Sequence, residues 1–323
     1  MLRTVSVHAA IQDELAQVEE TLQAIKRVDF AELSEMLDHV LASAGKMLRP
    51  SIALLAGKFN DNHRQELLVP LAASIELLHT ATLVHDDVID RASTRRGRPT
   101  ANSLFDNSIS VMLGDYMFAH AADLAARTGN IEVVRMFSRT LLAMARGELE
   151  QDMTAYDYGL TTRQYFRRIA SKTASLFAAA AEGGAIVSAA PDDWRVALQD
   201  YGESVGMAFQ IVDDILDFSG DEAEMGKPVG SDLLQGTLTL PSLLLMERYP
   251  RDNPVKRFFR HRRSPRHLAE AVETVVSSGI LDECQRVAGD FRDRAHAALE
   301  VLPAGEARES LAVIAVYVLE RRA

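Results

Sequence analysis

The sequence predicts an all-α fold built as a bundle of helices, and three observations lead to this prediction. Apolar residues recur at helical spacing from one end of the chain to the other, whereas the alternation typical of strands is almost absent. Alanine-rich stretches with small residues such as Gly202 and Gly206 favour close packing between helices. No run of Gly, Ser or Pro divides the chain, so residues 1–323 are expected to form one domain.

Helix breakers mark most ends of the predicted helices. Pro50 is tolerated in a first helical turn, and Gly129 and Gly220 each follow a long periodic segment. The first amphipathic stripe consists of Ile11, Leu15, Val18, Leu22 and Ile25. Longer helices are predicted over about 66–90, 102–127, 131–153, 162–188 and 192–218, and shorter ones near 242–248, 266–278, 280–299 and 305–321.

The composition of the 323 residues is that of an ordinary folded protein, with 47% hydrophobic and 25% charged residues. The formal net charge of −11 argues against a general nucleic-acid binder, because the phosphate backbone selects for basic surface. The one cysteine, Cys284, cannot form an internal disulfide, so a reducing cytoplasm is expected. No secretory signal is expected, because the first residues contain no uninterrupted apolar core. No transmembrane segment is expected either, because the most apolar later stretch, 176–190, is interrupted and short.

Two clusters of carboxylates share one spacing, i, i+1 and i+4, near the ends of two predicted helices. They consist of Asp86, Asp87 and Asp90 and of Asp213, Asp214 and Asp217. Carboxylates are disfavoured at the negative end of a helix dipole, by a few tenths to about 1 kcal/mol each. Like charges one turn apart add repulsion.

A bound cation would resolve this repulsion. Solvent exposure with salt bridges is the usual explanation for one such cluster. Both clusters, however, are embedded in strongly apolar helix sequence, which implies partial burial and raises the cost of uncompensated charge. Oxygen ligands select a hard ion, and Mg²⁺ typically bridges a few carboxylates to phosphate groups of a substrate. The sequence therefore predicts several Mg²⁺ ions around one polyphosphate.

Basic residues in short motifs predict two anion pockets, one reached through metal and one formed by cations directly. Each of these residues alone would be interpreted as a surface cation. They are Lys46 and Arg49 before a helix start, Arg95 and Arg96 after the first carboxylate cluster, Lys172, and Lys227. Small residues, Ala81 and Thr82, lie one turn before Asp86 and would leave open space or allow a close helix contact. His79, on the same stripe, is more often a hydrogen-bonded core histidine than a ligand.

At this point the sequence resembles the trans-isoprenyl (polyprenyl) diphosphate synthase family over nearly its whole length. Two DDxxD motifs with flanking basic motifs in this order are highly specific, although one alone is weak. The matching motifs are Gly45-Lys46…Arg49-Pro50, Asp86-Asp87-Val88-Ile89-Asp90, Arg95-Arg96-Gly97, Gly114-Asp115-Tyr116, Gly147-Glu148…Gln151, Lys172-Thr173 and Phe209-Gln210-Ile211-Val212-Asp213-Asp214-Ile215-Leu216-Asp217.

The resemblance implies a helical bundle around a deep central cavity, a homodimer, and Mg²⁺-dependent condensation of isopentenyl diphosphate head-to-tail onto an allylic diphosphate. It implies that the six aspartates of the two motifs hold Mg²⁺ on the allylic diphosphate. The other implied roles are contacts of Arg95, Lys172 and Lys227 with that diphosphate, binding of isopentenyl diphosphate by Lys46, Arg49, His79 and Arg96, and a place near the developing cation for Thr173 and Gln210.

Product length is predicted from the residues before the first motif. Short-chain members resemble one another in placing bulky aromatics there, whereas Ala81 and Thr82 are small. The sequence is most similar to long-chain, octaprenyl-type synthases, and Met117 or Phe137 would form the floor deeper in the cavity. One departure is Thr237, where the family commonly has Lys. A cation expected at the allylic diphosphate is therefore missing, while Lys172 and Lys227 remain.

Several alternatives stay open at this stage. The chain could be a short-chain farnesyl or geranylgeranyl diphosphate synthase, or a non-catalytic subunit of a heteromeric prenyl synthase, although such a subunit should lack part of these motifs. A metal phosphohydrolase is suggested by the pair His85-Asp86, but the other histidines lack matching spacing. A terpene cyclase is disfavoured by the full set Lys46, Arg49 and Arg96.

Overall fold

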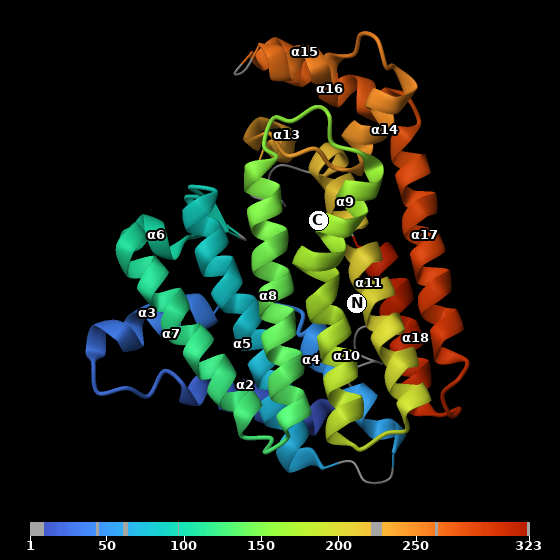
Figure 1. The fold of residues 1–323 in the computed structure, drawn as a ribbon. Helices are drawn as coiled ribbons and strands as arrows, with labels where there is room; N and C mark the ends of the chain where they lie inside the picture. Colours follow the sequence, from blue (N-terminus) through green and yellow to red (C-terminus); the bar gives the residue numbers. More distant parts are fainter. Residues whose placement is uncertain are drawn as a thin grey trace.

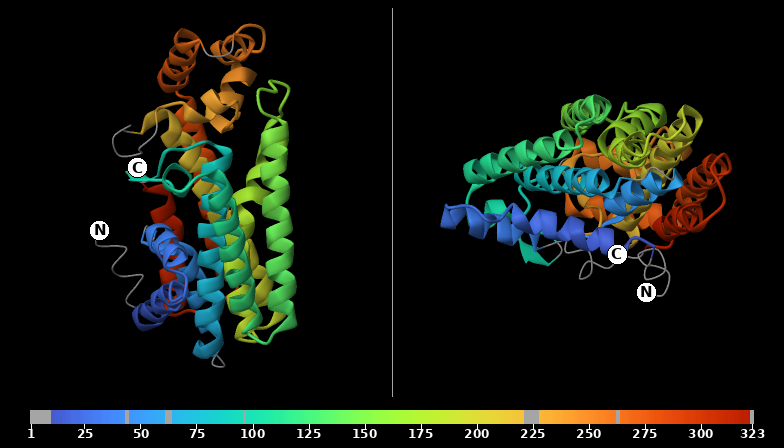
Figure 2. Two further views of the ribbon diagram at one scale, coloured as in Figure 1. Left: turned by 90° about the vertical axis from the view of Figure 1, so that its left-hand side faces the viewer. Right: turned by 90° about the horizontal axis from the view of Figure 1, so that it is seen from below.

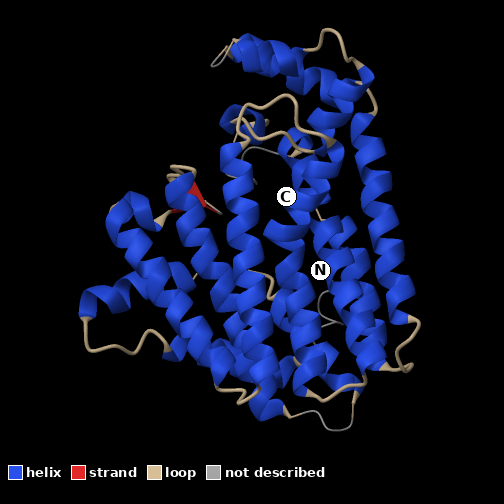
Figure 3. Ribbon diagram, viewed as in Figure 1, coloured by secondary structure: helices blue, strands red, loops and turns tan. Residues whose placement is uncertain are grey.

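The predicted all-α fold is confirmed by the computed structural model, which describes residues 10–42, 45–60, 64–95, 97–220, 228–261 and 264–321. Helices make up almost all of the described regular structure (Figure 1 and Figure 3). The only strands within these ranges are β1 (Thr94–Arg95) and β2 (Arg98–Pro99), an antiparallel pair in which Thr94 faces Pro99. This small hairpin follows directly on the first aspartate motif.

The helices follow the order of the sequence prediction, with additional breaks. Those of the N-terminal half are α2 (Gln12–Ala24), α3 (Ala31–Leu41), α4 (Leu48–Ala56), the 3₁₀ turn η1 (Gly57–Phe59), α5 (Gln65–Ile89), α6 (Ala101–Leu104), α7 (Asn107–Ala126) and α8 (Ile131–Met153). Those of the C-terminal half are α9 (Thr162–Ile169), the π-helical turn η2 (Ala170–Ala174), α10 (Ser175–Val187), α11 (Asp192–Ser219), α13 (Ser231–Gln235), α14 (Leu240–Arg248), α15 (Pro254–Arg260), α16 (Pro265–Ser277), α17 (Ile280–Leu299) and α18 (Glu306–Leu319).

Two predicted helices are divided in the structure. The segment predicted over 102–127 breaks at Asp106, which has a positive φ of 110° and accepts a hydrogen bond from the backbone N–H of Ile109 as the N-cap of α7. The segment predicted over 162–188 is interrupted by η2, where the helix widens to a π-helical turn. Such turns are inserted into α-helices frequently at functional sites. Hydrophobic periodicity does not report either break.

The core is centred on α5 and α10. Helix α5 packs on α7, α2 and α4, and α10 packs on α11, α4 and α8. The two views of Figure 2 place α5 between the N-terminal helices α2 and α3 on one side and α8 on the other. Twelve of the thirteen residues of α10 are buried, which explains its alanine-rich and glycine-containing sequence. Opposite faces of α5 therefore meet different neighbours, so adjacent residues of this helix lie in different surroundings.

Helix α5 is also the one candidate membrane span within the described residues. It is long and apolar enough to cross a bilayer by length and composition, but 67% of its most apolar window is buried inside the protein. Burial of this kind is expected of a core helix, which is apolar on all sides. The other described helices do not meet this test.

Gly147 allows α8 to approach η2 unusually closely. A Cβ atom at position 147 would lie 2.7 Å from the backbone N of Lys172 and 3.0 Å from its Cα. The neighbouring atoms are backbone, so they cannot rotate away. The position of Lys172 relative to α8 therefore depends on the absence of a side chain at Gly147.

We expect Gly147→Ala to lower the free energy of unfolding by about 1–3 kcal/mol, because it overpacks this contact. It should also reduce activity, since η2 must shift. The matched control is Gly289→Ala in α17, where a Cβ meets no atom within 4 Å, and this change should stabilise the protein by about 0.5–1 kcal/mol. Urea denaturation of both variants measures the effect, and equal stability of the two would contradict the packing explanation.

Candidate active site

The first aspartate motif lies at the C-terminal end of α5, and its members point in different directions. Asp87 is 5% exposed and accepts a hydrogen bond from Nε of Arg95 at 2.8 Å. Asp86 and Asp90 share the other face, because residues four apart lie on one side of a helix. That face is turned toward Lys172 and Glu148, whose charges act on both carboxylates.

Partial burial makes these carboxylates costly to ionise. Burial raises the pKa of Asp86 to about 6, with Glu148 and Asp90 adding to the rise and Lys172 opposing it. Burial likewise raises the pKa of Asp90. A raised carboxyl pKa indicates a negative charge that the folded protein compensates incompletely. This face of α5 can therefore accept additional positive charge.

Lys172 is a cation whose charge acts on this face. Its Nζ lies 2.5 Å from a carboxylate oxygen of Glu148 on α8. Although burial by itself lowers the pKa of Lys172, Asp86, Glu148 and Asp90 together raise it above the usual value. Lys172 is the third residue of η2 and the next residue, Thr173, belongs to the same π-helical turn.

The second aspartate motif lies near the end of α11, and two of its three members are almost completely buried. Asp217 has no exposed surface and accepts a hydrogen bond from the hydroxyl of Ser231 at 2.7 Å, as well as one from the backbone N–H of Asp232. It therefore caps the start of α13. Asp213 differs, because 48% of its side chain is exposed and it forms an ion pair with Arg321, at 3.6 Å.

Asp214 is the centre of a buried hydrogen-bond network. Its two carboxylate oxygens accept from the hydroxyl of Tyr165 at 2.6 Å and from the side-chain amide of Gln210 at 2.8 Å. Gln210 in turn accepts from the hydroxyl of Thr173 at 2.7 Å. Burial raises the pKa of Asp214 to about 7, and the hydrogen bonds from Tyr165 and Gln210 oppose this rise.

The two motifs are thus joined through η2. Lys172 faces the carboxylates of α5, and the adjacent Thr173 is hydrogen-bonded into the network of α11. A wide π-helical turn can direct consecutive side chains into one space more easily than an α-helix, in which they diverge by about 100°. The sequence prediction that the two acidic clusters flank one site is consistent with this arrangement.

A group of cations stacked on aromatic rings extends the site toward α4 and α18. The guanidinium of Arg49 lies 4.2 Å from the ring centroid of Phe177. That of Arg321 lies 4.0 Å from the ring of Phe209, and Nζ of Lys46 lies 5.4 Å from the ring of Tyr317. Cation–π contacts hold positive groups in place while leaving N–H donors for an anion.

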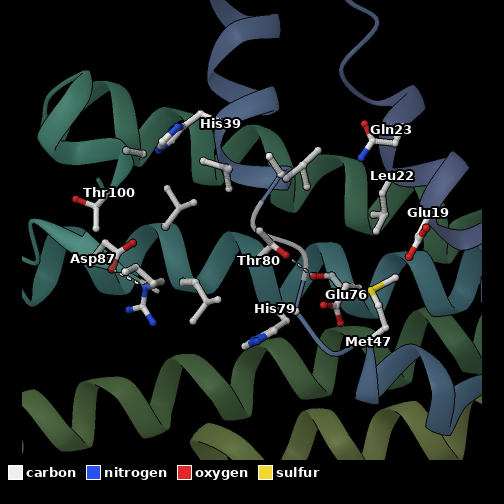
Figure 4. Close-up of a pocket in the computed structure, with 18 of the residues that line it drawn as sticks. Glu19, Leu22, Gln23, His39, Met47, Glu76, His79, Thr80, Asp87 and Thr100 are labelled. Atoms are coloured by element: carbon white, nitrogen blue, oxygen red, sulfur yellow. Dashed lines mark hydrogen bonds and ion pairs between the residues drawn. The ribbon is translucent and has the colours of Figure 1, made fainter. Parts of the chain in front are cut away.

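A cavity of about 290 Å³ lies on the side of α5 that faces α2 and α3 (Figure 4). Its α5 side includes Glu76, His79 and Asp87, while Glu19 and His39 come from α2 and α3. The predicted floor and tail residues, Ala81, Thr82, Met117 and Phe137, do not line it. Three of them, Ala81, Met117 and Phe137, are buried in the core, and the hydroxyl of Thr82 donates to the backbone oxygen of His79 at 2.7 Å.

Two predicted residues, Arg96 and Lys227, lie outside the described residues. Three further groups near the two motifs were absent from the predicted site. Glu148 belongs to a motif quoted above and could have been found from it, whereas Tyr165 and Arg321 carry no spacing signal in the sequence.

The donor set fits a hard divalent cation. Asp86, Asp90 and Asp213 offer carboxylate oxygens that are not fully used by protein donors. Within the described ranges no three acidic, His or Cys side chains already converge as a closed cation site. Mg²⁺ is usually held by one or two carboxylates together with water and substrate phosphates rather than by a closed protein cage, so this open arrangement agrees with it.

The raised pKa of Asp214 predicts how the stability of the metal-free protein depends on pH. The folded protein binds this proton more tightly, with a pKa of about 7 against 3.8 ordinarily. The contribution is therefore fully present below pH 3.8 and is lost as the pH rises to about 7.

Asp214→Asn should flatten the fall in the free energy of unfolding over this range, measured by urea denaturation in the presence of a chelator. The exposed Asp152→Asn is the control and should keep the wild-type slope. Parallel curves for wild type and Asp214→Asn would show that Asp214 does not titrate as described.

Comparison with known proteins identifies the family. The model of the family "Polyprenyl synthetase" matches residues 30–275. The chain is 38% identical over 315 residues to heptaprenyl diphosphate synthase component 2 of Bacillus subtilis, covering 98% of this chain and 90% of that protein. It is 37% identical to the octaprenyl diphosphate synthase of Escherichia coli, covering 98% and 94%.

Solved structures agree. A polyprenyl synthase from Caulobacter crescentus has a TM-score of 0.94 at 34% identity, covering 99% of this chain and 98% of that one. A decaprenyl diphosphate synthase from Rhodobacter capsulatus has a TM-score of 0.90 at 36% identity, covering 99% of both chains. The predicted fold class and the prenyltransferase class are confirmed by these matches. The chain belongs to the polyprenyl synthetase family.

Proposed function

We propose that this chain is a trans-polyprenyl diphosphate synthase that uses Mg²⁺ to condense isopentenyl diphosphate head-to-tail onto an allylic diphosphate, forming a long-chain product. The observation that carries this proposal is the junction at η2. Adjacent side chains, Lys172 and Thr173, connect the partly compensated carboxylates of α5 with the hydrogen-bond network of the second motif. Such a junction can hold a diphosphate and the carbon to which it is bonded at the same time.

The six aspartates have different proposed tasks. Asp86, Asp90 and Asp213 retain carboxylate oxygens for Mg²⁺, which when bound neutralises charge on the departing diphosphate. Asp87, Asp214 and Asp217 are occupied by Arg95, by Tyr165 with Gln210, and by Ser231. We therefore assign these three to orienting their neighbours. The resemblance implies six aspartate ligands for Mg²⁺, and this proposal reduces them to three.

The basic groups divide between two diphosphates. Arg95, Lys172 and Lys227 would contact the allylic diphosphate. Lys46, Arg49, His79 and Arg96 would hold isopentenyl diphosphate, and Arg321 joins them because it stacks on Phe209 close to Arg49, which lies 5.6 Å from the same ring. Fixed positive groups of this kind lower the cost of charge that develops on a leaving group.

The proposed reaction needs no nucleophilic side chain. The allylic C–O bond breaks with its electron pair going to diphosphate, and the double bond of isopentenyl diphosphate attacks the allylic carbon. Loss of a proton, taken up by the departing diphosphate, restores an alkene. Thr173 and Gln210 are hydrogen-bonded to each other beside Lys172, and their oxygen dipoles would stabilise the developing cation.

Long-chain specificity is proposed from the small residues one turn before the first motif. Ala81 has no exposed surface, and the hydroxyl of Thr82 donates a hydrogen bond to the backbone of its own helix, so neither residue projects a bulky group. Relatives named as heptaprenyl and octaprenyl diphosphate synthases support the same class. Met117 or Phe137 would limit the chain deeper in the core.

A homodimer of single-domain subunits in the cytoplasm is the proposed state. Exposed apolar side chains lie along α8, with Leu142 69%, Leu149 63% and Met153 83% exposed, and a second copy of this helix would cover them. Sedimentation equilibrium measures the mass, and a monomer at micromolar concentration would refute the dimer. The Bacillus relative is named as one component of a synthase, which is the specific reason to test a heteromeric alternative.

The decisive experiment uses the purified chain alone with Mg²⁺, labelled isopentenyl diphosphate and farnesyl diphosphate. We expect polyprenyl diphosphates of long-chain length, and Asp86→Asn or Asp213→Asn should reduce kcat/KM by about 100-fold or more, because each removes a proposed metal ligand. Activity only after addition of a second protein would select the component alternative. Orthophosphate release or a cyclic hydrocarbon would select a hydrolase or a cyclase.

Ala81→Phe should shorten the product, because a ring at this position would block the growing chain one turn below Asp86. Product sizes are compared by reverse-phase chromatography after dephosphorylation. The control is Ala145→Phe on α8, which adds the same ring at an exposed position and should leave the product lengths unchanged. An unchanged length distribution in Ala81→Phe would count against this placement of the tail.

A further inference from the structure

Arg168 is a buried cation to which neither the sequence motifs nor the proposed reaction assigns a task. It lies on α9, four residues before Lys172, and is 4% exposed. One of its terminal nitrogens donates to the backbone oxygen of Leu238, in the connection between α13 and α14. Its Nε is buried and has no hydrogen-bond partner among the described residues.

The charge of Arg168 is compensated only indirectly. Its guanidinium lies 5.8 Å from the ring centroid of Tyr165, whose hydroxyl binds Asp214. No carboxylate of the described ranges pairs with it directly, although Asp214, Asp232 and Glu148 all act on it through space. Burial lowers the pKa of Arg168. Burying a guanidinium with an unused donor costs folding free energy, which indicates that the charge of Arg168 serves the site.

The backbone that Arg168 holds is next to the position where the family pattern is broken. Leu238 follows Thr237, which stands where the family commonly has Lys. The N–H of Thr237 donates to the backbone oxygen of Asp232 at 2.8 Å, so this connection is folded back on α13. On the other side of this connection, the ring of Tyr156 packs directly against Gly236. A Cβ atom at position 236 would lie 2.5 Å from that ring, so only glycine fits there.

We propose that Arg168 is a positioning residue that supplies, from within α9, the positive charge that position 237 lacks. Its charge balances Asp214 and Asp232, and its hydrogen bond holds the connection at Leu238. The Asp214–Gln210–Thr173 network thereby stays oriented toward the allylic diphosphate. This inference rests on the proposed function, since it assigns Arg168 to the allylic side of the same site.

The test separates the charge of Arg168 from its hydrogen bond. Arg168→Gln keeps a donor for Leu238 but is neutral, whereas Arg168→Lys keeps the charge. The compensating change is Thr237→Lys, made alone and together with Arg168→Gln. Arg167→Gln is the matched control, because Arg167 is the neighbouring arginine on α9 and 58% of its side chain is exposed.

Two readouts are used for every variant. One is the KM for farnesyl diphosphate and for isopentenyl diphosphate, together with kcat. The other is the affinity for inorganic pyrophosphate with Mg²⁺ by calorimetry, which requires no turnover. Failure of the proposed function would appear as a wild-type protein that forms no polyprenyl diphosphate, whereas failure of this inference appears only in the comparison of variants.

We expect Arg168→Gln to raise the allylic KM and the pyrophosphate Kd about tenfold, because the site loses one positive charge, and to lower kcat, because the Gln210–Thr173 pair loses its orientation; the KM for isopentenyl diphosphate should stay nearly unchanged. Arg168→Lys should retain most of the affinity. Thr237→Lys should restore most of it in the Arg168→Gln background but change the wild type less than about twofold, a non-additive pair.

Other outcomes would overturn the assignment. Arg168→Gln with wild-type KM and Kd, or with a lowered Tm as its only change, would leave Arg168 a structural residue. Equal gains from Thr237→Lys in both backgrounds would show that Arg168 does not replace the missing lysine. If Arg168→Gln does not fold, Thr237→Lys alone still tests the proposal. A tenfold tighter pyrophosphate complex would show that the wild-type site lacks a charge and would overturn the proposal, whereas a change of less than about twofold would support it.

Discussion

The site depends on one constraint, which is that several carboxylates lie out of water and each needs a compensating group. Asp217 is compensated by a hydroxyl and a backbone N–H, Asp214 by two neutral donors, and Asp87 by the guanidinium of Arg95. Asp86 and Asp90 feel the positive charges of Lys172 and, more weakly, of Arg95, but Lys172 is shared with Glu148 and Arg95 with Asp87. The protein therefore gives Asp87, Asp214 and Asp217 direct hydrogen-bond donors, although burial still raises the pKa of Asp87 and Asp214, and it leaves oxygen atoms of Asp86 and Asp90 for cations.

The π-helical turn η2 is the structural device that joins these two groups of aspartates. It interrupts a long helical segment at the point where Lys172 and Thr173 are needed, and Gly147 permits α8 to lie against it. Glu148, next to Gly147, then becomes the partner of Lys172. A small residue on one helix and a wide turn on another thus bring together charges that lie far apart in the sequence.

The prediction of the fold succeeded where the physical signal was local. The stripe from Ile11 to Ile25 coincides with α2, and the segment 192–218 with α11, because burial of one helical face imposes its period on the sequence. The break at Asp106 and the turn η2 escaped prediction. Both are set by backbone conformation and by contacts with other helices, which leave no periodic trace.

Part of the site was predicted from the sequence, and part of it was not. Both aspartate motifs stood out because like charges at the end of an apolar helix oppose helix stability, and the family resemblance followed from their order. Arg321 and Tyr165 did not stand out, since each is a single residue whose partners come from a distant helix.

By itself, the sequence determined the helical class, the two acidic motifs and the family, because spacing defines which residues share a helix face. Only the tertiary structure decided which neighbour each face meets. Asp86 and Asp87 are adjacent in the chain, yet one is turned toward Lys172 and the other is held by Arg95 on a different side of α5. The compensation of a charge depends on such neighbours and on the water they exclude, and these are properties of packing rather than of order along the chain.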